Sequence, residues 1–418
     1  MRWKTKNDIL QGLAACRQAL SAAGERAESW VPVRQVIGQV AGIIPPEGRG
    51  VQQILVQLLQ AMQTLPAVMD VPTEEETRGL VRDLLALAEE QAEALPAKKL
   101  IIFLPYKASM WDSLESIWRA AVEDKEHCEA VVVPLPYADR NRDTTVKAWH
   151  CEADQFPKDV PVADWRQFRL ADLERLRPDA IFIHNAYDGQ NIITSVDADY
   201  YTGNLKKCTD NLIYVPYFVT GSHIATEFCT IDGIANVDHV IVENEAIKQQ
   251  YEEHYPFGTP PEGKFLALGS PKYDKVIGHT SDEYELPPAW AKLLAGKKSV
   301  LYNVSVVAML HHAEHFVEKI RCVFATFRKR DDVVLWWRPH PLMLATIETM
   351  RPALAEAYRA VVEEYKSAGW GIYDDTPDVD RAIICTDAYY GDGSSLVALY
   401  RATGKPVMIG TYDDVEGA

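Results

Sequence analysis

Two short polar stretches of the sequence have the composition of an anion-binding site. They are Arg-Pro-His-Pro at residues 338–341 and Gly-Asp-Gly-Ser-Ser at residues 391–395. Each follows a short apolar run that predicts a buried strand, and the second precedes a helical pattern. A guanidinium, an imidazole, hydroxyls and the free amides of a helix N-terminus all bind phosphate oxygens. We therefore predict a phosphate or diphosphate site built from Arg338, His340, Asp392, Gly393, Ser394 and Ser395.

Other strand ends supply further candidates for the same site. Asn303 and Ser305 lie at the end of a predicted strand over residues 299–303. Because ligands of parallel sheets bind outside the carboxyl ends of the strands, we expect these two side chains at the same edge. Lys272 follows a predicted strand over residues 265–268 and could approach a phosphate from the facing wall of a cleft. A solvated turn is an equally good interpretation of that lysine.

Three histidines are predicted to act as acids or bases. His184 and His223 lie at the ends of predicted strands that begin at residues 180 and 212. An imidazole at such a position could take the proton of an acceptor hydroxyl. His340 could donate a hydrogen bond to a phosphate or transfer a proton. For His184 and His223, a structural role at a strand end is an alternative.

A histidine-rich segment has a spacing that resembles a metal site. His311, His312 and His315 are close in sequence, and residues 311 and 315 share a helix face. No cysteine or carboxylate with a recognised spacing accompanies them. We therefore predict neither a metal nor another cofactor.

The overall composition restricts the class of protein. The chain has 418 residues, 47% hydrophobic and 25% charged, with a net charge of −17, which is typical of a soluble globular protein and argues against broad binding to nucleic acid. Its seven cysteines include no CxxC pair, which favours reduced thiols. Because no signal peptide or long apolar run is present, we expect a cytoplasmic protein. A helix face could still contact the inner surface of the membrane.

The periodicity of apolar residues divides the chain into three predicted domains. Residues 1–96 read as helices only, whereas residues 97–280 and 281–418 alternate short apolar runs with helical patterns. The polar segment with Pro287-Pro288 is the predicted linker, and residues 137–160 are predicted to form a long polar loop. The fold class is therefore α/β, with two Rossmann-like parallel-sheet domains that face a cleft, after an all-helical region. We expect that region to support packing or homo-oligomer formation, with membrane or acceptor-polymer contact as alternatives.

In order along the chain, these motifs resemble the CDP-glycerol glycerophosphotransferase family of teichoic-acid primases and polymerases. The resemblance covers roughly residues 98–418 and implies a GT-B fold. The family pattern is G-x-P-R-x-D, then R-x-H-P, then D-x-L-I-T-D-Y-S-S, then K-P. The matching residues are Gly269, Pro271, Lys272, Asp274, Arg338, His340, Pro341, Asp387, Asp392, Ser394, Ser395, Lys405 and Pro406.

The sequence departs from the family at two motifs. The family has W-H-G-T in its first α/β domain, and the resemblance implies that this histidine is the acceptor base. Here Thr220 occupies that position, and His223 follows three residues later. The threonine and tyrosine around the family's second aspartate are replaced by Gly391 and Gly393. The donor motifs are therefore better retained than the acceptor motif.

The resemblance implies transfer of glycerophosphate from a nucleotide-diphosphate donor such as CDP-glycerol to a hydroxyl of a polyol or glycan during synthesis of a cell-surface polymer. A GT-B glycosyltransferase that uses a nucleotide sugar is an alternative. A non-catalytic nucleotide-binding assembly protein is a second alternative, because of Thr220.

Overall fold

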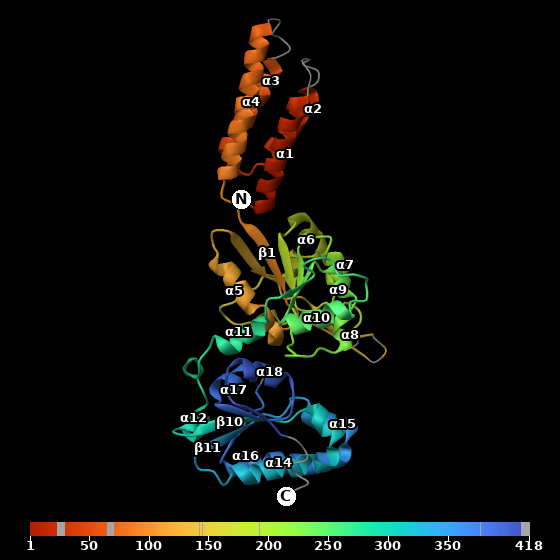
Figure 1. Cartoon of the computed structure of the whole chain (residues 1–418), viewed down its shortest axis with the longest axis vertical. Helices are drawn as coiled ribbons and strands as arrows, with labels where there is room; N and C mark the ends of the chain where they lie inside the picture. Colours follow the sequence, from red (N-terminus) through yellow and green to blue (C-terminus); the bar gives the residue numbers. More distant parts are fainter. Residues whose placement is uncertain are drawn as a thin grey trace.

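Three structural parts follow one another along the computed structural model, which describes all residues except 23–29, 65–70, 142, 144, 192, 377 and 411–418 (Figure 1). A helical bundle comes first, and two α/β parts with parallel sheets follow. The predicted boundaries fall between α4 and β1 and between α11 and the 3₁₀ helix Ser281–Glu283. We propose them as the domain boundaries. No helix among the described residues is both long and apolar enough to span a membrane.

The first part is a bundle in which each helix packs against the next and the last packs back on the first. Apolar residues at helical spacing, such as Ile9, Leu13 and Cys16, are fully buried in its core. Figure 1 shows the bundle projecting from the end of the molecule where β1 begins. Its helices are α1 (Trp3–Ala22), α2 (Val31–Ile43), α3 (Arg49–Thr64) and α4 (Val71–Ala94).

The second part contains a six-stranded parallel sheet in the order β2-β1-β5-β7-β8-β9. Its central strands are apolar at nearly every position because helices cover both faces. Ile102 and Leu104 belong to one buried cluster and Phe103 to the cluster on the other face. The strands are β1 (Lys99–Leu104), β2 (Cys128–Val132), β5 (Ala180–Ile183), β7 (Leu212–Tyr214), β8 (His239–Val242) and β9 (Phe265–Ala267). The helices are α5 (Glu115–Glu123), α6 (Leu170–Leu176), α7 (Thr202–Leu205), α8 (Thr226–Cys229), α9 (Gly233–Asn236), α10 (Glu245–Glu253) and α11 (Pro271–Ile277).

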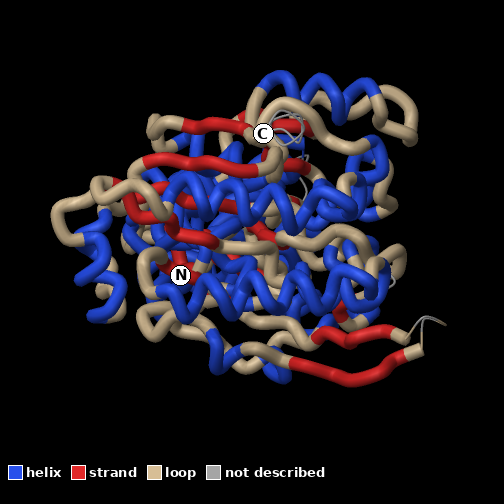
Figure 2. The backbone as a smooth tube through the Cα atoms, turned by 90° about the horizontal axis from the view of Figure 1, so that it is seen from below, coloured by secondary structure: helices blue, strands red, loops and turns tan. Residues whose placement is uncertain are grey.

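The prediction of a long polar loop over residues 137–160 is wrong. The segment forms a hairpin of β3 (Tyr137–Arg140) and β4 (Val146–His150), which β6 (Thr194–Val196) extends to a three-stranded antiparallel sheet. Figure 2 shows the hairpin strands projecting from the body. Most side chains of β4 are exposed on both faces, so the strand has no apolar alternation that the sequence could reveal.

The third part contains a five-stranded parallel sheet in the order β12-β11-β10-β13-β14. In chain order, β11 and β12 lie on one side of β10, and β13 and β14 lie on the other side. This reversal of direction creates a topological switch point between β10 and β13. The strands are β10 (Lys298–Asn303), β11 (Val333–Trp337), β12 (Ile372–Tyr373), β13 (Ala388–Gly391) and β14 (Val407–Ile409). The helices are α12 (Pro288–Leu294), α13 (Val306–His311), α14 (Ala313–Phe327), α15 (Met343–Met350), α16 (Ala355–Ala368), α17 (Val379–Cys385) and α18 (Ser395–Ala402).

Candidate functional site

The switch point of the second sheet brings several predicted site residues together. Asn303 and Gly391 are paired in register at the carboxyl ends of β10 and β13. The Asn303 amide nitrogen donates to the backbone oxygen of Arg338 at 2.8 Å, and the Ser394 hydroxyl lies 3.5 Å from the Asn303 side-chain oxygen. The loops after β10, β11 and β13 therefore meet at one edge, as the sequence predicted.

The turn into α18 leaves an anion-binding surface free. Ser394 is the N-cap residue of α18 but makes no side-chain capping bond, while Gly393 and Ser395 are exposed. The first amides of a helix have no partner within the helix and carry its positive dipole end. Gly391 is required here, because its φ is +150° and a Cβ would lie 2.1 Å from the Asn303 carbonyl oxygen.

Arg338 lies in the predicted loop, but its guanidinium already has partners. It is buried, with Nη1 2.9 Å from the Asp374 carboxylate and Nη2 donating to the Thr376 carbonyl at 2.6 Å. The prediction that Arg338 directly neutralises a diphosphate is therefore not supported by this geometry. The sequence could not reveal Asp374, because its carboxylate reaches Arg338 from the loop after β12.

Asp392 also has an internal role in place of the predicted ligand contact. Its carboxylate is buried, with one oxygen 2.8 Å from the Lys319 ammonium and the other accepting from the Ser305 amide at 2.7 Å. The Ser305 hydroxyl in turn caps α13 by accepting from the Ala308 amide at 3.1 Å. These bonds fix the loops on either side of the switch point and leave the carboxylate no face toward a ligand.

His340 is an exposed histidine at the edge of a cavity of about 490 Å³. Its Nδ1 accepts from the Leu342 amide at 3.1 Å. A neutral ring with that bond carries its proton on Nε2, which can donate to an anionic oxygen. Aromatic side chains of Tyr358 and Tyr373 line the same cavity.

A second cavity, of about 550 Å³, lies between the two α/β parts. Thr220, Gly221 and Ser222 come from the loop after β7, and Ser394 and Ala398 come from the start of α18. A Cβ at Gly221 would lie 3.5 Å from the Ala398 Cβ, so the two walls approach closely. The carboxyl edges of both sheets therefore face one cleft.

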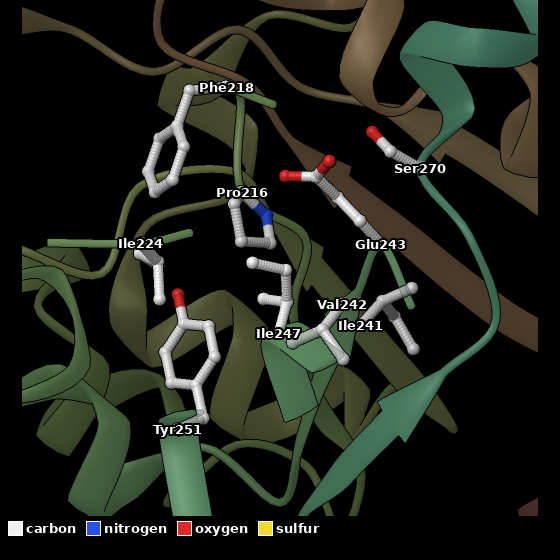
Figure 3. Close-up of a pocket in the computed structure, with 9 residues that line it drawn as sticks. All are labelled: Pro216, Phe218, Ile224, Ile241, Val242, Glu243, Ile247, Tyr251 and Ser270. Carbon is white, nitrogen blue, oxygen red and sulfur yellow. The ribbon is translucent and has the colours of Figure 1, made fainter. Parts of the chain in front are cut away.

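Glu243, which the sequence did not single out, organises the first-domain wall of this cleft. Its carboxylate accepts from the Thr220 amide and hydroxyl, the Gly221 amide at 2.9 Å and the Tyr273 hydroxyl at 2.6 Å. Figure 3 shows this carboxylate beside Ser270, above an apolar pocket. With a volume of about 10 Å³, that pocket holds no more than about one water molecule and is not a substrate site. The available sequence signal was an acidic residue at the carboxyl end of a strand, since Glu243 directly follows β8.

His184 is enclosed in the core, which contradicts its predicted role as acceptor base. Its side chain is fully buried. Nε2 accepts from the Tyr106 amide at 3.0 Å, and Nδ1 lies 3.2 Å from the Met110 carbonyl oxygen. Burial, with a smaller contribution from the positive charge of Lys272, lowers the pKa of His184 to about 3. A ring with both nitrogens engaged and no access to the cleft has a structural role.

The other two predicted residues of the first α/β part differ in accessibility. His223 is exposed in the loop after β7, next to Ser222, which lines the cleft. Lys272 forms a largely buried ion pair with Asp112, so its predicted approach to a donor phosphate is not seen. In the third part, His311 ends α13 while His315 belongs to α14, 3.9 Å from Glu318. Within the described parts of the chain, no group of His, Cys, Asp and Glu has an arrangement suited to a metal ion.

Comparison with solved structures identifies the fold. A protein of Listeria monocytogenes assigned as a UDP-N-acetylglucosamine 2-epimerase superposes with a TM-score of 0.50 at 13% identity, over 77% of this chain and 82% of that chain. The fold is GT-B. This confirms the predicted architecture of two Rossmann-like domains after a helical region.

Two further solved structures superpose less well. They are the UDP-GlcNAc 2-epimerase of Methanocaldococcus jannaschii (TM-score 0.47, 11% identity, 74% and 83% of the two chains) and the wall teichoic acid polymerase TagF (TM-score 0.40, 13% identity, 83% and 81%). No known family profile and no curated protein matches the sequence. At these identities the comparisons establish the fold alone.

Proposed function

We propose that this GT-B protein is a transferase that uses a nucleotide-diphosphate donor, with CDP-glycerol as the donor indicated by its sequence motifs. One observation carries the proposal. The N-terminus of α18 opens at the switch point of the second sheet into a cavity whose other wall is the carboxyl edge of the first sheet. An anionic donor on one wall and an acceptor on the other fit such a cleft.

The donor phosphates would bind to the first amides of α18. The hydroxyls of Ser394 and Ser395 and the Nε2 proton of His340 would supply further hydrogen bonds. Fixed donors of this kind stabilise charge that develops on a leaving phosphate without reorganisation. Arg338 would act indirectly, because its pairing with Asp374 holds the loop that presents His340.

The nucleoside would lie in the cavity beside His340. The half-buried Tyr373 offers aromatic surface there, and the Lys366 ammonium lies 4.3 Å from the centre of its ring, whereas Tyr358 is almost fully buried. Aromatic surface with a few polar groups at its rim is typical of small-molecule sites.

The acceptor hydroxyl would enter from the loop after β7. For CDP-glycerol, the acceptor oxygen attacks the phosphorus that bears glycerol, the bond to CMP breaks, and the acceptor proton passes to a base. We assign that base to His223, because it is exposed beside the cleft whereas His184 is sealed. A nucleotide sugar would instead lose its nucleoside diphosphate.

Binding measured by calorimetry tests the donor site. Ser394→Asp places a carboxylate where the phosphates are proposed to bind, and we expect it to weaken CDP-glycerol or CMP binding by at least about tenfold, which is about 1.4 kcal/mol. Ser281→Asp, at the exposed start of another helix, is the matched control and should bind as the unaltered protein does. Equal affinity in both variants would refute the site.

An assay with several nucleotides also distinguishes the alternative functions. CDP-glycerol, UDP-N-acetylglucosamine, CMP and UDP are offered with a polyol acceptor, and release of free nucleotide is followed. Turnover of the sugar donor alone favours a glycosyltransferase. Tight binding with no turnover of any donor, and no effect of His223→Ala, favours a non-catalytic nucleotide-binding protein.

A further inference from the structure

One side of the helical bundle has no acidic residue and few basic ones. The sequence contains no charged residue from Gly50 to Met69, and the only charged residues of α2 and α3 are Arg34 and Arg49. After Arg49 and Gly50, the exposed described positions of α3 are glutamines and Val56, and exposed positions of α2 include Val31, Gln35 and Ile43. Val31, Ile43 and Val56 are 43%, 46% and 46% exposed. Because α2 packs against α3, these positions form one continuous face, which we call the glutamine face.

The opposite side of the bundle has the usual charged surface. α4 also exposes Leu80 and Leu87, but Arg82, Asp83 and Glu90 are exposed among them. Charged residues are depleted at the cores of protein interfaces, whereas an ordinary solvated helix face carries them. The contrast within one bundle therefore marks the glutamine face as a contact surface.

A second copy of this chain is the partner that the face fits. The net charge of −17 opposes the approach of two copies, and this repulsion is smallest at the glutamine face, because α2 and α3 contain no acidic residue. A glutamine amide both donates and accepts hydrogen bonds, so a surface of glutamines is complementary to itself across a twofold axis. Exposed Gly38 and Gly42 have no atoms within 4 Å of an added Cβ, so a partner helix could approach α2 closely.

The size of the face is sufficient for a specific contact. α3 has 16 residues and is therefore about 24 Å long, and two adjacent helices are about 20 Å wide. Two copies in contact would remove about 1,000 Å² from water, which is the lower bound for a specific interface. A membrane surface fits less well, because membrane-surface helices carry basic residues on their polar face.

The bundle contacts the first α/β part on the side away from the cleft. The Trp3 amide donates to the Lys98 carbonyl at 2.8 Å, directly before β1. Ion pairs join Asp8 to Arg177 at 3.1 Å and Lys4 to Asp210 at 3.0 Å. These contacts lie at the amino edge of the first sheet, whereas the residues that line the cleft follow its carboxyl edge. Figure 1 shows the bundle and the third part at opposite ends of the first α/β part.

We propose that the chain forms a homodimer through the α2–α3 glutamine face, which leaves both clefts open. The inference does not depend on the proposed donor site, because it concerns a different part of the molecule. Its consequence is that one particle contains two clefts.

Light scattering on the full chain tests the dimer. We expect a particle of twice the 47.0 kDa chain mass at micromolar concentration. Gln53→Glu with Gln60→Glu, both exposed on α3, places four carboxylates at the twofold contact and should give a monomer. The matched control, Gln11→Glu with Gln18→Glu on the exposed side of α1, adds the same charge elsewhere and should stay dimeric.

A charge reversal excludes simple misfolding. Gln53→Lys with Gln60→Lys should also be monomeric alone, and a mixture of the Glu and Lys variants should recover the dimer mass. A monomeric unaltered protein, a dimer that persists in the Gln53/Gln60 variants, or a mixture that stays monomeric would each overturn the proposal. A monomer that binds vesicles of phosphatidylglycerol would assign the face to a membrane surface instead.

Discussion

Replacing Asp380 by asparagine should change how stability depends on pH. Asp380 lies on α17 and is partly buried, and its buried Oδ1 makes no hydrogen bond among the described residues. Burial, together with the negative charge of Asp112 in the first α/β part, raises the pKa of this carboxyl to about 6. Lys272 and Lys275 act in the opposite direction but do not compensate, while Asp378 adds to the increase.

The sign and size of the effect follow from that pKa. An acid whose pKa rises from 3.8 to about 6 on folding binds its proton more tightly in the folded state. The stability that the protonated Asp380 carboxyl contributes is therefore fully present below about pH 4, and it is lost as the pH rises through about 6. The shift of about two units corresponds to about 3 kcal/mol. For a domain of this size that is worth roughly 6–12 °C in Tm.

Thermal unfolding of the unaltered protein and Asp380→Asn at about pH 5 and about pH 8 measures about half of this difference, roughly 1.4 kcal/mol, because the other half is already lost at pH 5. We expect the variant to gain stability relative to the unaltered protein between the two pH values, because asparagine stays neutral. Asp282→Asn, at an exposed carboxylate of the 3₁₀ helix Ser281–Glu283, is the control and should show no such gain. If Asp380→Asn and Asp282→Asn have the same pH dependence, Asp380 does not bind a proton on folding and the reasoning fails.

Two further predictions concern the switch point of the second sheet. Gly391→Ala should destabilise the protein by about 3 kcal/mol or more and lower its Tm, because the added Cβ overlaps the Asn303 carbonyl oxygen. The control Gly393→Ala should leave the Tm nearly unchanged, because a Cβ at residue 393 has open space around it. Equal Tm values for the two variants would contradict the described packing at Gly391. Lys319→Met should lower the free energy of unfolding, measured in urea, by about 3–5 kcal/mol, because the Asp392 carboxylate then stays buried without its cation. A variant with unchanged stability would show that this ion pair is not formed.

Most strands of the parallel sheets could be predicted because the central strands are buried on both faces, whereas the two-residue strand β12 (Ile372–Tyr373) was not predicted. The predicted strand over residues 299–303 lies within β10, and the predicted strand over residues 265–268 begins where β9 begins. β4 escaped prediction for the converse reason, since its side chains are mostly exposed and its stability comes from pairing with β3. Apolar periodicity reports burial, so a strand without burial leaves no signal.

The location of the candidate site could be predicted from the sequence, but the ion pairs of its charged residues could not. Parallel strand ends share an edge, which is enough to bring Asn303 and Gly391 together. The partner of each charged group depends on three-dimensional packing: Asp112 is 160 residues from Lys272, and Lys319 is 73 residues from Asp392. A sequence read locally cannot show that these charges are already paired. The roles of His223, His340, Ser394 and Ser395 stay predictions.

The pairing of these charges changes how the motifs of the second α/β part should be understood. The sequence predicts that Arg338 and Asp392 bind a ligand, yet each forms a buried ion pair that stabilises a loop at the switch point. Removing either partner would leave an uncompensated buried charge, so these residues contribute to the site through its geometry. The groups proposed to contact the donor phosphates are neutral: two serine hydroxyls, helix amides and an imidazole. Binding through such fixed dipoles should therefore be less sensitive to salt than binding through free arginines, because a dipole carries no net charge for counterions to screen.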